Sequence, residues 1–195
     1  MREYTVERTT KETDIKLSVN IDGRGKADIN TGCGFLDHML ELLAHHSKFD
    51  LSVYCKGDIK VDYHHTAEDI AIALGEAVNK ALGDRKGINR YADIHLVMDE
   101  ALVLCALDIS GRSHLSYSVE IPSQKIGDFD SELIEEFFCG FVRSANITLH
   151  LKKLDGRNSH HIAEAVFKAF ARCMRKAVSP DVEFIDEIPS SKGVL

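Results

Sequence analysis

The sequence predicts an α+β fold made of two copies of a βββαβα unit, with the helices sandwiched between two four-stranded sheets. Two observations lead to this prediction. The segments DYHHTAEDIAIALGEA and NSHHIAEAVFKAFARC, residues 62–77 and 158–173, match with both histidines and the following glutamate aligned. Earlier in each half, Glu12, Gly23 and Arg24 correspond in the same order to Glu100, Gly111 and Arg112. Because both matches keep their order along the chain, we predict an internal duplication.

Each half reads as three strand-like runs, a helix, another strand and a longer helix. In the first half, strands are expected near 2–9, 13–21, 26–30 and 50–56, and helices near 34–47 and 63–82. In the second half, strands are expected near 91–98, 101–109, 114–119 and 146–152, and helices near 131–145 and 159–178. Gly83 is expected to end the first long helix, and Pro180 follows the last one.

Apolar side chains recur along one face of three predicted helices. They are Ile70, Leu74, Val78 and Ala81; Leu133, Phe137, Phe138 and Phe141; and Ile162, Val166, Phe170 and Cys173. Such faces must cover a sheet, and the two halves could bury their helical layers against each other; two separate helix-on-sheet domains are the alternative. We expect one compact domain over 1–195, with pseudo-repeats 1–86 and 87–180. The C-terminal tail, 181–195, is expected to be mobile at its end.

The composition is that of a globular protein that folds without a partner, with 44% hydrophobic and 28% charged residues. A net charge of −7 opposes binding to nucleic acids and to anionic membranes. The first residues lack a signal-peptide pattern and no apolar run is long enough to cross a membrane, so a cytoplasmic location is expected. The five cysteines are scattered without CxxC spacing, which predicts buried thiols.

Histidine doublets are the most informative motif. In two of them, the first histidine and a glutamate four positions later lie on one helical face, while the second histidine points about 100° away. The two boxes consist of His64, His65 and Glu68, and of His160, His161 and Glu164. Because adjacent histidines cannot easily bind one ion, the boxes predict two metal sites that pair crosswise. Imidazole with carboxylate suits Mn, Fe, Ni, Co or Zn. A capped, solvent-facing helix start is the alternative for one box, but two boxes in register favour metal binding.

Residues near the boxes are further candidates. Asp62 and Asn158 are N-cap types that would place the histidines in the first helical turn. His38 lies close to the apolar face of the preceding helix, and Glu136 occupies a similar place in the second half. Both are therefore candidate metal ligands.

The other histidines carry weaker signals. His45 and His46 end a helix, where the helix dipole favours cations, so a structural role and a site role are equally open. His95, His114 and His150 lie on strand-like runs without partners in sequence, and we interpret them as structural.

The two boxes, together with GFLDHMLELLAHHS and the terminal IPSSKGVL, resemble imidazoleglycerol-phosphate dehydratase of histidine biosynthesis. The resemblance covers essentially the whole chain. It implies two βββαβα halves with helices between the sheets, a ribosomal protein S5 domain 2-like fold. It also implies a hydro-lyase that converts D-erythro-imidazoleglycerol phosphate to imidazoleacetol phosphate, with two Mn²⁺ ions per active site that bind the imidazole or imidazolate ring.

The same resemblance implies the ligands of each ion. One Mn²⁺ would take His38, His64, Glu68 and His161, and the other would take His65, His160, Glu164 and the residue at position 136. The family often has His there, whereas this chain has Glu136. Glu12 is implied as the acid/base that moves a proton between the substrate carbon and the leaving hydroxyl, although by sequence alone it is an exposed turn residue. Its repeat mate Glu100 is expected to be a surface turn residue.

The resemblance further implies a phosphate site and an assembly. The substrate-binding residues would be His46, Arg90, Arg112, Lys168, Ser190, Ser191 and Lys192. The C-terminal tail, 181–195, would order over the bound substrate and cover it. Metal-free trimers would join into a 24-subunit homo-oligomer with active sites between subunits. The expected partner is a small phosphate substrate.

Two other functions are weighed against this one. A non-catalytic metal-binding or assembly protein of the same fold would leave Glu12, Arg112 and the tail without a role. A nucleic-acid-binding module is opposed by the acidic charge and the absence of Trp.

Overall fold

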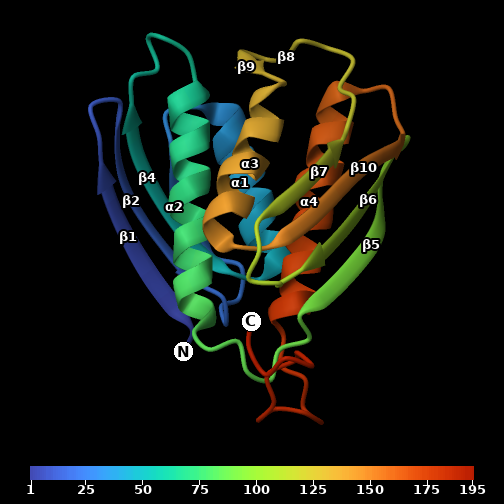
Figure 1. The fold of residues 1–195 in the computed structure, drawn as a ribbon. Coiled ribbons are helices and arrows are strands. Elements are labelled where there is room, and N and C mark those ends of the chain that lie inside the picture. The colour runs from blue at the N-terminus through green and yellow to red at the C-terminus, as the bar shows by residue number, and fades with distance from the viewer.

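The computed structural model describes all 195 residues and contains two units of the predicted kind (Figure 1). The first comprises β1 (Glu3–Thr9), β2 (Thr13–Asn20), β3 (Ala27–Asn30), α1 (Gly34–Ser47), β4 (Asp50–Gly57) and α2 (His64–Leu82). The second comprises β5 (Tyr91–Met98), β6 (Ala101–Asp108), β7 (His114–Ser118), α3 (Leu133–Ala145), β10 (Thr148–Asp155) and α4 (Ser159–Val178). Two short strands, β8 (Lys125–Ile126) and β9 (Phe129–Asp130), form an additional hairpin before α3.

The two four-stranded sheets have the same topology. Their strand orders are β1-β2-β4-β3 and β5-β6-β10-β7. In each sheet the last pair is parallel and the other pairs are antiparallel. The register repeats as well, because Arg8 faces Ile15 in the first hairpin and Leu96 faces Val103 in the second. The predicted α+β fold of duplicated halves is confirmed.

The four helices lie between the two sheets (Figure 1). α2 packs against β1 and β2, α4 packs against β5 and β6, and the layer is closed by α2 on α3 and α1 on α4. Phenylalanine rings with centroids 5.1 to 5.4 Å apart fill its centre: Phe137, Phe138, Phe167 and Phe170. One contiguous cluster of 56 buried apolar residues runs through both halves, so the chain does not form two separate helix-on-sheet domains.

The region before α3 is where the prediction was wrong. The sequence predicted no element between the strand near 114–119 and a helix from 131, whereas the helix begins at Leu133 after the β8–β9 hairpin. The backbone N–H of Ser131 donates to the carbonyl of Gln124, which closes this hairpin. Strands of two residues are too short to show a period. Tertiary contact stabilises the hairpin instead, since the Tyr63 hydroxyl donates to Asp128 at 2.8 Å.

The thiols follow the prediction with one exception. Cys33, Cys55, Cys105 and Cys173 are buried, whereas Cys139 is only half-buried, and all five are free. None of the helices combines the length and the apolarity that would be needed to span a membrane.

The packing of α2 on α3 depends on Gly75. A Cβ at this position would lie 2.5 Å from the carbonyl oxygen of Phe141 and 3.0 Å from the backbone nitrogen of Ala145. We expect Gly75→Ala to lower the free energy of unfolding by about 1–3 kcal/mol, because overpacking outweighs the better helix propensity of alanine. Urea unfolding followed by circular dichroism measures the change. Gly34→Ala, at a helix start with open space, is the matched control, and equal stability of the two variants would contradict the prediction.

Candidate functional site

The residues predicted to bind metal gather at one end of the molecule. All four helices begin at this end, beside the β8–β9 hairpin, and the β1–β2 and β5–β6 turns lie at its rims (Figure 1). The starts of α1, α2 and α4 therefore bring His38, His64 and His160 to the same end of the folded molecule.

Polar side chains before each box hold its first turn. The Asn158 Oδ1 accepts the backbone N–H groups of His160 and His161, at 2.9 and 3.2 Å, and Asn158 is the N-cap of α4 as predicted. Asp62 accepts the backbone N–H of His64 at 2.7 Å, but the N-cap of α2 is the next residue, Tyr63. Both boxes thus begin with an oriented helical turn.

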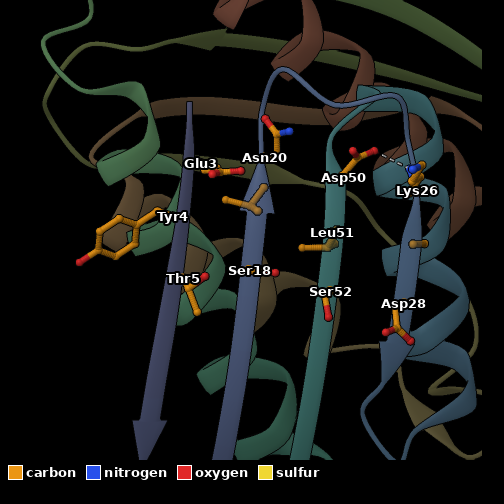
Figure 2. Close-up of a pocket in the computed structure, with 12 residues that line it drawn as sticks. Glu3, Tyr4, Thr5, Ser18, Asn20, Lys26, Asp28, Asp50, Leu51 and Ser52 are labelled. Atoms are coloured by element: carbon orange, nitrogen blue, oxygen red, sulfur yellow. Dashed lines mark hydrogen bonds between the residues drawn. The ribbon is translucent and has the colours of Figure 1, made fainter. Parts of the chain in front are cut away.

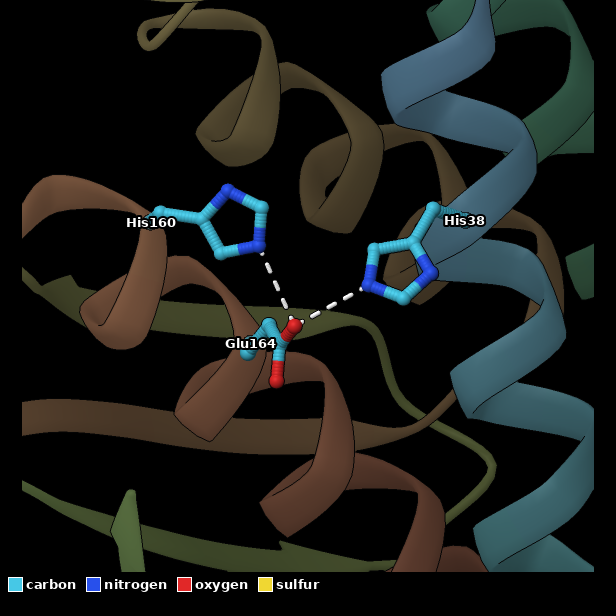
Figure 3. Close-up of side chains that lie close together, drawn as sticks. All are labelled: His38, His160 and Glu164. Atoms are coloured by element: carbon cyan, nitrogen blue, oxygen red, sulfur yellow. Dashed lines mark hydrogen bonds and ion pairs between the residues drawn. The ribbon is translucent and has the colours of Figure 1, made fainter. Parts of the chain in front are cut away.

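His38, His160 and Glu164 meet between α1 and α4 (Figure 3). The Nε2 atoms of His38 and His160 lie 3.0 and 3.1 Å from Oε1 of Glu164, and the three candidate ligand atoms all lie within 4.8 Å of one another. Glu164 is only 8% exposed, and its other oxygen accepts a hydrogen bond from Lys168. Burial raises the pKa of Glu164, but the hydrogen bonds from Lys168, His38 and His160 outweigh it and hold the pKa at about 2. The carboxylate is therefore ionised, as a ligand of a metal cation must be.

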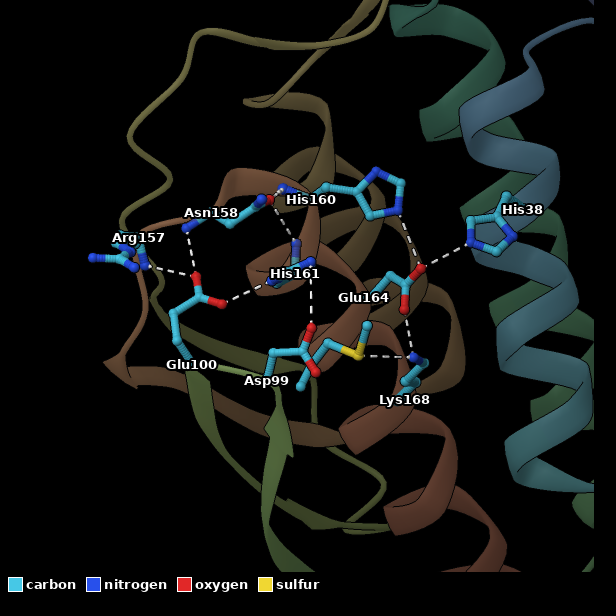
Figure 4. A network of polar contacts seen from close by, with 10 residues as sticks. His38, Asp99, Glu100, Arg157, Asn158, His160, His161, Glu164 and Lys168 are labelled. Carbon is cyan, nitrogen blue, oxygen red and sulfur yellow. Dashed lines mark hydrogen bonds and ion pairs between the residues drawn. The ribbon is translucent and has the colours of Figure 1, made fainter.

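His161 is bound by Glu100, in the turn between β5 and β6 (Figure 4). The Nδ1 atom of His161 lies 2.7 Å from Oε2 of Glu100, whose Oε1 accepts the backbone N–H groups of Arg157 and Asn158. The hydrogen bond with His161 contributes most to lowering the pKa of Glu100 to about 2, and it raises the pKa of His161. The prediction for Glu100 was right about the turn and wrong about the side chain, which ties this turn to the start of α4.

His65 has a similar arrangement with a different carboxylate. Its Nδ1 lies 3.0 Å from Oδ2 of Asp58, in the loop between β4 and α2, and its Nε2 lies 3.7 Å from Oε1 of Glu12. The hydrogen bond with Asp58 raises the pKa of His65. In both boxes a carboxylate therefore binds Nδ1 of the second histidine. Histidines that bind a metal through one ring nitrogen are commonly oriented by such a carboxylate on the other.

The remaining predicted ligands do not join the cluster within one chain. Glu68 forms an ion pair with Arg143 of α3 at 3.1 Å, while the side chains of His64 and the half-buried Glu136 have no polar partner. Neither predicted set of four ligands converges in a single chain. The observed cluster combines His38 from one set with His160 and Glu164 from the other.

A hollow of about 830 Å³ on the outer face of the first sheet is separate from these residues (Figure 2). Its lining comes from all four strands and includes Tyr4, Asp28 and Asp50. Asp50 is already occupied, because it accepts the backbone N–H groups of Arg24 and Lys26 at 2.8 and 2.9 Å. The hollow therefore presents no group of converging reactive side chains.

Comparison with known proteins decides the family. The family model described as imidazoleglycerol-phosphate dehydratase matches residues 31–174. Proteins of that name from Azorhizobium caulinodans and Cereibacter sphaeroides are 55% and 53% identical over 195 residues, covering 100% of this chain and 99% and 100% of theirs. The chain belongs to the imidazoleglycerol-phosphate dehydratase family. Crystal structures of the dehydratases from Staphylococcus aureus and Pyrococcus furiosus each match with a TM-score of 0.84, at 39% and 36% identity, over 91% and 97% of this chain and 99% and 100% of theirs.

Membership of the dehydratase family makes the chain an enzyme, a hydro-lyase of histidine biosynthesis. The predicted family and enzyme class are confirmed. The shared name of the relatives speaks against the non-catalytic alternative.

Several residues that the dehydratase resemblance implies for substrate binding lie at the end of the molecule opposite the histidine cluster. Arg90 binds Asp108 through Nε at 2.7 Å and donates from Nη1 to the Pro189 carbonyl at 2.7 Å. The backbone N–H of Arg90 donates to the carbonyl of Ala177, near the end of α4. Ala177 is roughly 25 Å along α4 from His160, at 1.5 Å per residue. One chain therefore does not bring Arg90 to its own histidine cluster.

The other substrate-binding candidates lie at this same end of the molecule, except Lys168, which lies in the middle of α4 and donates to Glu164. Arg112 is exposed and donates from Nη1 to the Ser110 carbonyl at 3.1 Å. His46 is half-buried, and burial together with nearby cations, His45 and Lys168 among them, lowers its pKa. Ser190, Ser191 and Lys192 lie in the tail, which hydrogen-bonds to Gly87 in both directions.

Two carboxylates of the site were missed by sequence reasoning. Asp58 lies in a loop seven positions before His65, a separation that follows no helix or strand period. Glu100 carried a usable signal, because it is the repeat mate of Glu12 and its partner His161 is the repeat mate of His65.

Proposed function

We propose that the chain dehydrates D-erythro-imidazoleglycerol phosphate to imidazoleacetol phosphate at a site where two Mn²⁺ ions bind the imidazole ring. The cluster of His38, His160 and Glu164 carries this proposal. Two imidazole Nε2 atoms and an ionised carboxylate within 4.8 Å form a donor set that suits Mn²⁺. Although burial raises the pKa of Glu164, the hydrogen bonds from Lys168, His38 and His160 already hold it in its charged form.

The second histidines of the boxes also fit a ligand role. Asp58 and Glu100 bind the Nδ1 atoms of His65 and His161, which favours the tautomer with the lone pair on Nε2. Glu136, where the family often has His, offers a carboxylate that Mn²⁺ accepts. The eight ligands would thus be His38, His64, His65, Glu68, Glu136, His160, His161 and Glu164.

We infer that neighbouring subunits complete each active site. Neither set of four ligands meets within one chain, and all the phosphate-binding candidates except Lys168 lie far from the histidine cluster of the same chain. An assembly of trimers into a 24-subunit particle would supply the missing residues from adjacent chains. Metal binding would then also stabilise the assembly.

The reaction needs a group that moves a proton. Bound Mn²⁺ would withdraw electrons from the imidazole ring and make the neighbouring C–H bond more acidic. Glu12 would take this proton and transfer one to the departing hydroxyl, which leaves as water. Its side chain is 52% exposed and lies 3.7 Å from His65, so it is accessible beside the proposed ligands. Arg90, Arg112, Lys168, Ser190, Ser191 and Lys192 would bind the phosphate, with His46 nearby.

Removal and return of the metal tests this proposal. Protein stripped with a chelator is expected to form no imidazoleacetol phosphate, and Mn²⁺ is expected to restore its formation. Mg²⁺ is the control, because it prefers oxygen ligands and holds its water. Full activity of the stripped protein would contradict the proposal. Stoichiometric Mn²⁺ uptake without activity would instead support the non-catalytic alternative.

A further inference from the structure

Three polar residues join the β1–β2 turn to α2 within a largely apolar interface. The Thr13 hydroxyl donates to Oδ2 of Asp69 at 2.5 Å, and Nη1 of Arg8 lies 2.5 Å from the same oxygen. Thr13 is 2% exposed and Asp69 is 7% exposed. The next inward-facing residues of β2 are all apolar, beginning with Ile15 and Leu17. The three residues, here named the Arg8–Thr13–Asp69 triad, form the polar part of this contact.

The triad is connected directly to Glu12. Thr13 follows Glu12 in the chain, and the Thr10 hydroxyl accepts the backbone N–H groups of both, at 3.1 and 3.0 Å. The backbone N–H of Thr10 donates to the Thr13 carbonyl at 2.8 Å and closes the turn. The carboxylate of Glu12 has only the 3.7 Å contact with His65. The position of Glu12 relative to the histidine box of α2 is therefore set through Thr13 and Asp69.

At the three corresponding positions the second half has no polar side chains. The repeat places Leu96, Ala101 and Ala165 at the positions of Arg8, Thr13 and Asp69, and the strand register agrees. Ala101 and Ala165 are fully buried. The fold thus does not require the triad, and a buried carboxylate is more expensive to desolvate than alanine. Its presence in one half only calls for a reason specific to that half.

The turns of the two halves differ in what holds them. In the second half, the carboxylate of Glu100 itself ties the turn to α4 by accepting two backbone N–H groups and contacting His161. Its repeat mate Glu12 makes no such bonds, and Asp58 takes the place on His65 Nδ1. The triad holds the first turn from the buried side, so the oxygens of Glu12 remain available.

We propose that Arg8, Thr13 and Asp69 are positioning residues for Glu12, which hold its turn against α2 and leave its carboxylate unoccupied. The proposal rests on the proposed function of Glu12 as the proton-transferring group. Thr13 is the residue through which the triad acts, because it is covalently joined to Glu12.

Kinetics of Thr13→Val test the proposal, because valine keeps the shape and removes the hydroxyl. We expect kcat to fall about 10- to 100-fold, as for a displacement of about 1 Å, with KM changed less than about twofold. Thr13→Ser is expected to restore most of kcat. Thr9→Val is the matched control, since it removes a hydroxyl that binds Asp14 at 2.7 Å on the exposed side of the same hairpin.

Combination with Glu12→Gln separates positioning from general support of the structure. If the triad acts through Glu12, Thr13→Val causes no further loss of kcat in the Glu12→Gln background. Equal losses in both backgrounds, an unchanged kcat of Thr13→Val, or a fall of kcat that follows loss of bound Mn²⁺ would each overturn the proposal. Full activity of Glu12→Gln alone would instead overturn the proposed role of Glu12. Should Thr13→Val not fold, Asp69→Asn allows the same comparisons.

Discussion

Glu12→Gln is expected to lower kcat for dehydration by about 10³-fold, within the range typical of general acid–base groups. Glutamine keeps the size of the side chain but cannot accept a proton from carbon. Because Glu12 is exposed and touches the proposed ligands only at 3.7 Å from His65, Mn²⁺ content and assembly are expected to stay at the wild-type level. Steady-state formation of imidazoleacetol phosphate and the amount of metal per chain measure both.

Glu7→Gln is the control for this substitution. Glu7 lies on β1, is exposed, and pairs with the equally exposed Lys16, so its loss is expected to leave kcat within about twofold. Activity of Glu12→Gln equal to that of Glu7→Gln would show that another group moves the proton.

His64→Ala is expected to abolish both activity and the large assembly, with activity lower by about 10³-fold or more. His64 has no polar partner within its own chain, although it begins α2 in a turn held by Asp62. This fits a ligand whose metal and remaining donors come from a neighbouring subunit. Light scattering after size-exclusion chromatography, in the presence of Mn²⁺, measures the assembly.

The folding of this variant needs its own check. His95→Ala is a suitable control, because His95 is exposed on β5 and lies outside the proposed site. Circular dichroism is expected to be the same for both variants, while only His95→Ala keeps the wild-type assembly. A His64→Ala chain that remains a metal-free trimer with full activity would refute the role of metal in catalysis.

Local patterns predicted most of the secondary structure. The predicted helices at 34–47 and 159–178 agree with α1 and α4, and the strand at 91–98 agrees with β5. Each of these elements shows a clear apolar period or a recognisable end. The β8–β9 hairpin has neither, because its strands contain two residues each and depend on contacts with Tyr63, the residue before α2.

The sequence also indicated which residues belong to the candidate site. It did not indicate which of these residues lie next to one another. The repeated boxes identify His64, His65, His160 and His161 as a set, because duplication places the same residues at the same helical positions. Which of them meet depends on packing between helices. His38 joins Glu164, a residue 126 positions away, because α1 packs on α4.

The sequence by itself therefore determined the duplication and the fold class and identified the candidate metal ligands, since all three depend on spacing and repetition along the chain. Only the tertiary structure decided that Glu100 is bonded while Glu12 is free, and that Thr13 and Asp69 hold the Glu12 turn. It also decided that the phosphate-binding candidates other than Lys168 lie far from the histidine cluster of the same chain. These relations join residues 56 or more positions apart, and such contacts leave no periodic signal in the sequence.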